Sequence, residues 1–276
     1  MLEGFALIKR TAVLAFCLAL CGVAQADNSL LDSVRTADSQ SLGLSLSSYS
    51  NNDAESSFKA LNFGVVYQGI KALTGERFVV FDADYATGPD TYSGSLGDLV
   101  IPKYYYDLKL SIGKDLVYDS YVLSPYIGLG YRFLKQSGGG LFTPTGNYFY
   151  DRQSTYNYIP VGLKRRIALA DGATLETTVE YDYLISGNQY SGLSAANNAS
   201  GYTGATNVNN KQNSGYGLNA SLMYRRPDGW SFGPYWKYWN IDASESALRS
   251  YNSANYPTTE LANTTEEFGI KALFKF

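Results

Sequence analysis

Acidic side chains recur at even spacing in two parts of the sequence. Asp82 and Asp84 form one group, and Glu176, Glu180 and Asp182 form the other. Paired carboxylates serve as acid and base in glycoside hydrolases, and carboxylate oxygens are also ligands for Ca²⁺. The same spacing arises on any polar face of a β-strand, because successive side chains point to opposite faces. We therefore expect a polar strand face, with catalysis and calcium binding as alternatives.

The absence of histidine excludes several kinds of chemistry. The chain has 276 residues and no histidine, so triads and dyads with a histidine base and histidine-ligated metals are excluded. Both cysteines, Cys17 and Cys21, lie in the first 26 residues, which leaves the rest of the chain without a thiol. The formal net charge of −3 does not suit binding to nucleic acid. We predict no enzyme activity, no metal and no cofactor.

Charged side chains of both signs share one parity along the predicted strands and therefore share one face. The residues expected to form a polar network on that face are Asp107, Lys109, Arg132, Glu180, Asp182, Lys237 and Lys271. Basic and acidic members are nearly balanced, which favours a hydrogen-bonded, salt-bridged core over a charge-selective filter. The alternative is a narrow conduit in which Lys109, Arg132 and Lys237 face the three carboxylates Glu180, Asp182 and Asp107 across a constriction.

The elements that must position these residues are segments with an apolar or aromatic side chain at every second position. In the first of them, Leu42, Leu44 and Leu46 share one face. These segments cover residues 41–48, 60–68, 79–85, 104–112, 125–133, 159–167, 175–183, 216–224, 230–238 and 268–276. Beyond residue 26 no stretch approaches the roughly 18 apolar residues of a spanning helix, so a closed sheet remains as the way to cross a membrane.

The connections between these segments alternate in length. Short ones cover residues 69–75, 113–119, 168–172 and 226–229, and long polar ones cover residues 51–57, 88–102, 136–152, 187–212 and 242–263. The alternation predicts an all-β fold: a transmembrane, antiparallel, up-and-down β-barrel of ten strands, with the long loops at one end and both termini at the other. A secreted β-sandwich would share the strand period but gives no reason for this asymmetry.

The glycines of the predicted strands indicate a narrow barrel. They have the parity opposite to the apolar face and so point inward: Gly43, Gly64, Gly128, Gly130, Gly162, Gly215, Gly217, Gly233 and Gly269. Large side chains share that inward parity, among them Tyr105, Tyr126, Arg132, Tyr235 and Trp239. Missing side chains accommodate large neighbours where space is short, and a ten-stranded barrel is expected to be nearly filled.

The N-terminal region carries the pattern of a secretory signal peptide. Lys9 and Arg10 precede an apolar segment at 11–23, and Ala24-Gln25-Ala26 supplies a small-x-small cleavage site. We expect residues 1–26 to be the signal peptide and 41–276 the barrel. Acylation at Cys21 is the alternative, but Leu20 precedes it where lipoprotein signals usually carry a small residue. The segment 27–40 is predicted to be a short periplasmic or lumenal helix or a disordered tail.

The final strand, residues 268–276, resembles the C-terminal strand by which bacterial outer-membrane proteins are recognised for barrel assembly. Phe268, Phe274 and Phe276 supply its aromatic pattern, whereas Lys271 replaces the usual glycine. The resemblance extends to small porin-like and opacity-type barrels and to no narrower family. It implies an outer-membrane location with periplasmic termini, and outer-membrane lipid, lipopolysaccharide and the barrel-assembly machinery as partners.

The sequence defines the fold of the protein better than it defines the function. Omptin-type proteases are also ten-stranded barrels, but their mechanism needs histidine. The loop segments 190–204 and 251–259 are rich in Tyr, Asn, Ser, Gly and Thr, a composition typical of recognition surfaces and also of solvated loops that bind nothing. We expect a role in surface recognition, adhesion or envelope integrity, with an extracellular ligand bound by the loops. The alternative is a narrow porin-like channel for small solutes.

Overall fold

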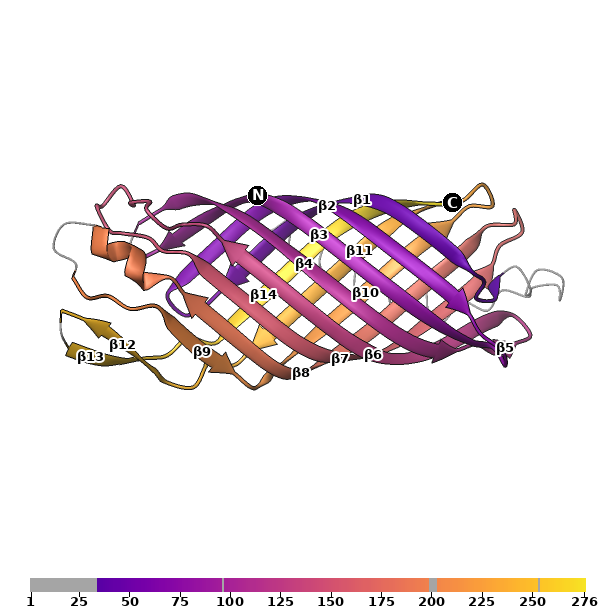
Figure 1. The fold of residues 1–276 in the computed structure, drawn as a ribbon. Coiled ribbons are helices and arrows are strands. Elements are labelled where there is room, and N and C mark those ends of the chain that lie inside the picture. The colour runs from indigo at the N-terminus through magenta and orange to yellow at the C-terminus, as the bar shows by residue number, and fades with distance from the viewer. Residues whose placement is uncertain (1–33, 96, 199–202, 253) are drawn as a thin grey trace.

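The computed structural model describes residues 34–95, 97–198, 203–252 and 254–276; the expected signal peptide at 1–26 and residues 27–33 lie outside them. Ten strands form a closed antiparallel barrel (Figure 1), which confirms the predicted fold class. The wall consists of β1 (Ser39–Asn52), β2 (Ser56–Ala72), β3 (Arg77–Gly94), β4 (Leu99–Lys114), β6 (Tyr121–Gln136), β7 (Arg152–Ala168), β8 (Thr174–Ser191), β10 (Gly215–Arg225), β11 (Trp230–Ile241) and β14 (Asn263–Lys275). Neighbours in this order pair, and β14 closes the barrel on β1.

Four shorter strands and a 3₁₀ turn lie outside this wall. The strand β5 (Leu116–Tyr118) forms a hairpin with the start of β6. At the opposite end, β9 (Val208–Gln212) pairs with the end of β8, β12 (Ala247–Tyr251) pairs with β13 (Ala254–Thr258), and η2 covers Leu193–Asn198. Figure 1 shows β9, η2 and the β12–β13 hairpin extending past the barrel. None of these elements was predicted, because each is too short to display a period.

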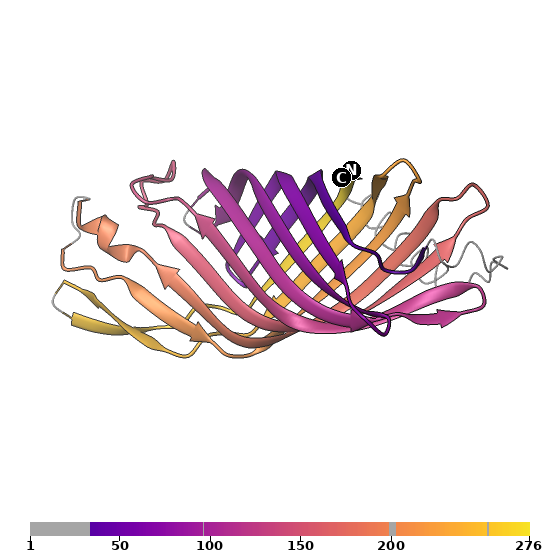
Figure 2. The same cartoon turned by 45° about the vertical axis from the view of Figure 1, so that its right-hand side comes forward.

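The barrel has a turn end and a loop end. The turn end carries the short connections, and there the N–H of Phe276 donates to the carbonyl of Gln40 at 2.9 Å. The loop end carries the connections 53–55, 95–98, 137–151, 192–207 and 242–262. Figure 2 shows how strongly the strands tilt between the two ends.

The predictions for two of the five long loops are wrong. The strands that flank these loops continue beyond the segments with an apolar side chain at every second position. The predicted loops 51–57 and 88–102 are occupied largely by strand, and only residues 53–55 and 95–98 connect them. Beyond the apolar band the inward rings of Phe58 and Tyr92 pack 5.1 Å apart, together with Ile101. Strands of 14 to 18 residues exceed the roughly 9–11 residues that cross a bilayer, so the barrel projects beyond the membrane.

The outer and inner faces differ as the strand period predicts. Outward leucines such as Leu44, Leu61 and Leu129 are 53%, 64% and 65% exposed. Aromatic rings pair on the outer face near both ends, with Tyr106 and Phe133 5.1 Å apart towards the loop end and Trp230 and Phe274 5.2 Å apart towards the turn end. An apolar exterior bounded by aromatic girdles is what a lipid bilayer requires of a barrel. Among the described residues no helix is long and apolar enough to cross a membrane.

Inward glycines provide the space for inward rings. A Cβ atom on Gly130 would lie 2.1 Å from Cζ of Tyr158, and one on Gly162 would lie 2.1 Å from Cζ of Tyr126. A Cβ atom on Gly269 would lie 2.9 Å from Cε1 of Tyr235. The sequence-based expectation that large polar rings lie opposite glycines is met, and the rings fill space that a ten-stranded barrel would otherwise leave open.

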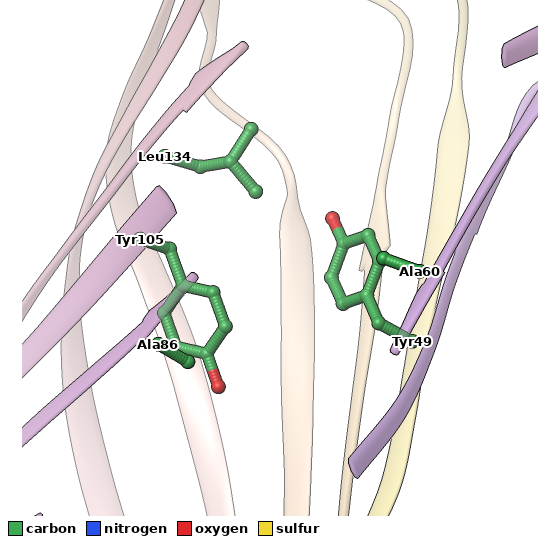
Figure 3. Packing of buried hydrophobic residues seen from close by; sticks show 5 residues of the cluster. All are labelled: Tyr49, Ala60, Ala86, Tyr105 and Leu134. Carbon is green, nitrogen blue, oxygen red and sulfur yellow. The ribbon is translucent and has the colours of Figure 1, made fainter. Parts of the chain in front are cut away.

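Towards the loop end the lumen contains a small apolar core. Tyr49 from β1 and Tyr105 from β4 point inward from opposite sides of the lumen, with Ala60, Ala86 and Leu134 around them (Figure 3). Tyr49 is 1% exposed and Tyr105 2%. The barrel therefore has an interior that is packed with side chains at this level.

The fit between glycine and ring predicts the effect of adding one methyl group. Gly162→Ala is expected to destabilise the barrel by about 1–3 kcal/mol, because the new methyl group would overlap the Tyr126 ring and that ring can move only by giving up its hydrogen bond to Glu180. Ser221→Thr adds the same methyl group beside a cavity and should leave stability almost unchanged. Denaturant unfolding in detergent compares the two, and equal losses would contradict the assignment of a tight fit.

Candidate functional site in the lumen and loop cap

Glu267 on β14 accepts hydrogen bonds from side chains of three other wall strands. Its carboxylate, 1% exposed, accepts hydrogen bonds from the hydroxyls of Tyr105 at 2.7 and 2.8 Å, Tyr235 at 2.6 Å and Ser47 at 2.9 Å. These side chains come from β14, β4, β11 and β1, so the contacts tie distant parts of the wall together. Glu267 has the inward parity of its strand, opposite to that of Phe268 and Phe274, but it was not among the predicted network residues.

A second network surrounds Glu180 on β8. Lys109 from β4 forms an ion pair with it at 2.7 Å across the lumen, and Tyr126 donates to its other oxygen at 2.8 Å. Asn219 donates to Glu180 at 2.9 Å and to Asp182 at 2.5 Å. Asp182 is fully buried, and its Oδ1 has no hydrogen-bond partner among the described residues. The predicted opposition of Lys109 and Glu180 is therefore present.

Arg132 lies in the lumen against two aromatic rings, and within the described part of the chain it forms no salt bridge. Its guanidinium carbon lies 5.0 Å from the Tyr105 ring centre and 5.6 Å from that of Trp239, and the side chain is 3% exposed. Asp107 is its neighbour in the β4–β6 ladder and accepts a hydrogen bond from Tyr158. Buried guanidinium over aromatic faces gains cation–π attraction once water is excluded, so this layer forms a compact barrier.

Lys237 and Lys271 are the two remaining lysines of the predicted network. Lys237 forms its ion pair with Asp84 of β3 at 2.5 Å, a partner that the sequence did not suggest. Lys271 forms no ion pair within the described part of the chain, and its ammonium lies 5.7 Å from the Tyr235 ring. The predicted network residues thus share the lumen but form several separate contacts and not one opposed constriction.

The carboxylates first considered for catalysis are held by neighbours. Asp82 accepts from Gln68 at 2.8 Å, and Glu176 pairs with Arg225 at 2.7 Å. Together with the contacts of Asp84, Glu180 and Asp182, these interactions use the acidic groups as structural partners. This arrangement favours the polar-core interpretation of both acidic patterns.

The turn half of the lumen is hollow, whereas the loop half is filled. A cavity of about 100 Å³ is bordered by Asp82, Lys109 and Lys271. A second, of about 330 Å³, opens at the turn end and shares Glu176 and Arg225 with the first. The hollow part of the barrel is therefore accessible from the turn end.

On the loop side of the Arg132 layer, buried side chains occupy the lumen. Lys103 and Asp90 are both fully buried and pair at 3.2 Å, and Gln136 donates to the same carboxylate at 2.7 Å. The Lys103 ammonium lies 3.2 Å from the centre of the Tyr49 ring. These contacts could not be predicted from the apolar period, because Asp90 and Gln136 were expected to lie in loops and Lys103 and Tyr49 lie outside the predicted strands.

The segment before β1 lies across the turn end. Val34 is 2% exposed and packs on Val122 and Ala168. The carboxylate of Asp38 accepts hydrogen bonds from Lys71 and from the N–H of Ala72, and the bond from Lys71 lowers the pKa of Asp38. Residues 35–38 of the expected 27–40 segment form an irregular strap, and β1 begins at Ser39. Residues 27–33 lie outside the described residues, so a helix or a tail there stays a prediction.

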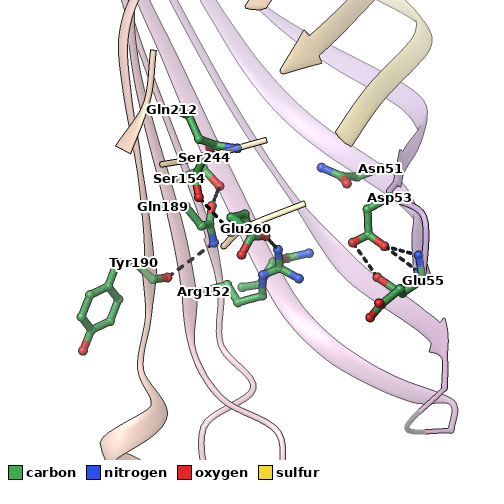
Figure 4. Close-up of polar contacts among 12 residues, drawn as sticks. Asn51, Asp53, Glu55, Arg152, Ser154, Gln189, Tyr190, Gln212, Ser244 and Glu260 are labelled. Carbon is green, nitrogen blue, oxygen red and sulfur yellow. Dashed lines mark hydrogen bonds and ion pairs between the residues drawn. The ribbon is translucent and has the colours of Figure 1, made fainter. Parts of the chain in front are cut away.

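The long loops form a structured cap. Arg152, at the start of β7, pairs with Glu260, whose N–H donates to Ser244 at 2.8 Å (Figure 4). Gln212 accepts a hydrogen bond from Tyr156 of the barrel wall at 3.1 Å. The connection 242–262 is therefore fastened over the lumen by buried and half-buried polar contacts.

Of the predicted assembly signal, Phe268 and Phe274 lie on the outer face of β14, and Phe276 follows the last residue of that strand. Phe268, Phe274 and Phe276 are 36%, 40% and 67% exposed. Their exposure is that expected of a lipid-facing aromatic strand, and recognition of that strand by an assembly factor stays a prediction.

A closed antiparallel barrel with an apolar exterior and a polar, partly filled interior defines a membrane-spanning β-barrel. Solved structures of bacterial outer-membrane proteins share this fold. The outer membrane protease OmpT from Escherichia coli matches with a TM-score of 0.55 and 11% identity, over 88% of this chain and 100% of that one. The translocator domain of autotransporter NalP from Neisseria meningitidis has a TM-score of 0.41 and 12% identity, over 99% and 97%.

Neisserial surface protein A is also similar, with a TM-score of 0.35 and 11% identity, over 87% of this chain and 100% of that one. No protein-family model matches the chain, and no curated protein matches its sequence. At 11% identity the likeness to the protease shows the fold alone. The chain has the fold of bacterial outer-membrane β-barrels, and the activity of the protease is not carried over to it.

The Lys109–Glu180 pair predicts a test of the polar core. Lys109→Met is expected to cost about 3 kcal/mol, because it leaves a buried carboxylate without its counter-charge. Lys109→Met combined with Glu180→Gln should recover more than half of that loss. Unfolding of the single and double variants in detergent measures the coupling, with Lys59→Met on the exposed surface as control, and additive losses would contradict the ion pair.

Proposed function

We propose that the protein is an outer-membrane barrel that acts at its loop end as a surface-recognition or adhesion protein. The observation that carries this proposal is the filled loop half of the lumen. Lys103 and Asp90 are fully buried there, and Arg132 and Trp239 are 3% and 2% exposed. A barrel packed in this way has no water column for solutes to follow, so its accessible chemistry lies on the loops.

The orientation follows from the asymmetry of the two ends. In bacterial barrels the short turns face the periplasm and the longer loops face the exterior. The short connections and the C-terminal Phe276 share the turn end. We therefore assign the turn end to the periplasm and the loop cap to the cell surface.

The loop cap contains a pocket of about 520 Å³ with suitable chemistry for a ligand. Phe142, Tyr148 and Tyr190 contribute rings to its lining, and Asp151 contributes a carboxylate. Asp151 accepts the N–H of Gly139 at 2.7 Å, and this contact holds the loop in shape. Rings beside a carboxylate and backbone groups suit a ligand with one apolar face and several hydroxyl groups, such as a saccharide.

A narrow channel is the second candidate function. It is favoured by the hollow turn half of the lumen, whose two cavities share lining residues. Conduction would require the layer of Arg132 and Trp239 to move aside, together with the Lys103–Asp90 pair beyond it. Because several buried contacts would have to break at once, this function is the less favoured of the two.

Binding to an immobilised saccharide panel tests the recognition function. The purified protein is expected to bind a subset of the panel, and Asp151→Asn combined with Tyr190→Ala should weaken that binding about tenfold or more, as for loss of a central contact pair. Tyr256→Ala removes an exposed ring on β13 and serves as the matched control. Undiminished binding by the double variant, or by a variant shortened within 187–212, would contradict the assignment.

A further inference from the structure

Arg77 and Lys114 lie side by side on the outer face of the barrel at the turn end. Arg77 is the first residue of β3 and Lys114 the last of β4, and the two are direct partners in the ladder. Both side chains are exposed. Like charges placed opposite each other on neighbouring strands destabilise a sheet, so this pair favours a nearby anion.

Each of these cations has an acidic neighbour in the sequence, and both acidic neighbours form ion pairs with other residues. Glu76 forms its ion pair with Arg35 of the strap. Asp115 is buried inside the barrel, where it pairs with Arg166 at 2.7 Å. Within the described ranges of the chain, neither cation of the ladder pair forms an ion pair. The protein thus presents two positive charges at one point of its outer surface without supplying their counter-charge.

A notch of about 370 Å³ lies beside the two cations, which form part of its lining. The rest of the lining includes Ile112 and Ile127, which are 49% and 51% exposed on the lipid-facing side. The β4–β6 ladder ends at the pair Gly113 and Tyr126. The next residue, Pro125, has no N–H with which to continue it. The interruption of the ladder lies directly beside this apolar hollow.

The level of the notch along the barrel is that of the membrane surface. The outward rings of Tyr67 and Phe81 lie 6.2 Å apart near the turn end, and such rings mark the membrane–water boundary. Arg77 precedes Phe81 by four residues on β3, which is roughly 13 Å along the strand. The two cations therefore lie where lipid headgroups lie, and the apolar part of the notch faces the acyl chains.

We propose that Arg77, Lys114 and the notch beside them form a binding site for an anionic phospholipid, such as phosphatidylglycerol. The guanidinium and the ammonium hold the phosphate, a geometry that guanidinium groups suit because they donate two parallel hydrogen bonds. One acyl chain lies over Ile112 and Ile127. The lipid site is separate from the loop cap. A negative result for lipid binding would therefore leave the proposed recognition function untouched, and the reverse also holds.

Native mass spectrometry of the folded protein in detergent tests this site. With equal amounts of phosphatidylglycerol and phosphatidylethanolamine, the wild-type protein is expected to retain one phosphatidylglycerol with a preference of about tenfold, as two surface cations allow. Arg77→Gln combined with Lys114→Gln should abolish the preference. Ile127→Trp keeps both charges but fills the notch, and it should reduce retention of the same lipid.

The matched control is Lys59→Gln combined with Arg249→Gln, which removes two exposed positive charges at the loop end and should leave retention unchanged. Folding of each variant is checked by its shift on gels between unheated and heated samples. Retention of phosphatidylglycerol by the Arg77 and Lys114 variant at the wild-type level would overturn the proposal. Complete displacement of the lipid by millimolar inorganic phosphate would also overturn it, since that result describes a phosphate site without a lipid component.

Discussion

The structure depends on the need of inward polar groups to find partners inside the barrel. Lipid surrounds the wall, and a ten-stranded barrel is too narrow to supply each inward group with bulk water. Glu267 meets this need with three hydroxyl donors, and Glu180 meets it with Lys109, Tyr126 and Asn219. These contacts join strands that are far apart around the wall, so the interior both fills the barrel and ties it together.

The same need divides the molecule into two functional ends. Where the rings and Arg132 meet, side chains occupy the cross-section, and beyond them the pair of Lys103 and Asp90 continues the packing to the loop cap. On the other side the interior stays hollow as far as the strap at the turn end. In the proposed orientation a ligand from outside meets the loops first, and the hollow turn half faces the periplasm.

Much of this architecture could be predicted from the sequence, because strand faces have a period of two. Leu42, Leu44 and Leu46 identify the lipid side, and the same parity places Glu267 and Arg132 inside. Parity does not reveal which residues meet across the lumen, since that depends on the stagger of the strands around the barrel. Lys237 pairs with Asp84 for this reason and not with the carboxylates expected from sequence. The strand extensions escaped prediction because outside the membrane their outer face need not be apolar.

The central claim is that the lumen is closed by side chains on its loop side. Planar-bilayer recording of the purified wild-type protein tests it most directly, because a continuous water path produces discrete current steps and a packed lumen does not. A lumen closed in this way gives a silent bilayer at ordinary voltages after verified insertion of the folded barrel. Reproducible unitary conductance steps from the wild-type protein would contradict it and move the function from the loops to the lumen.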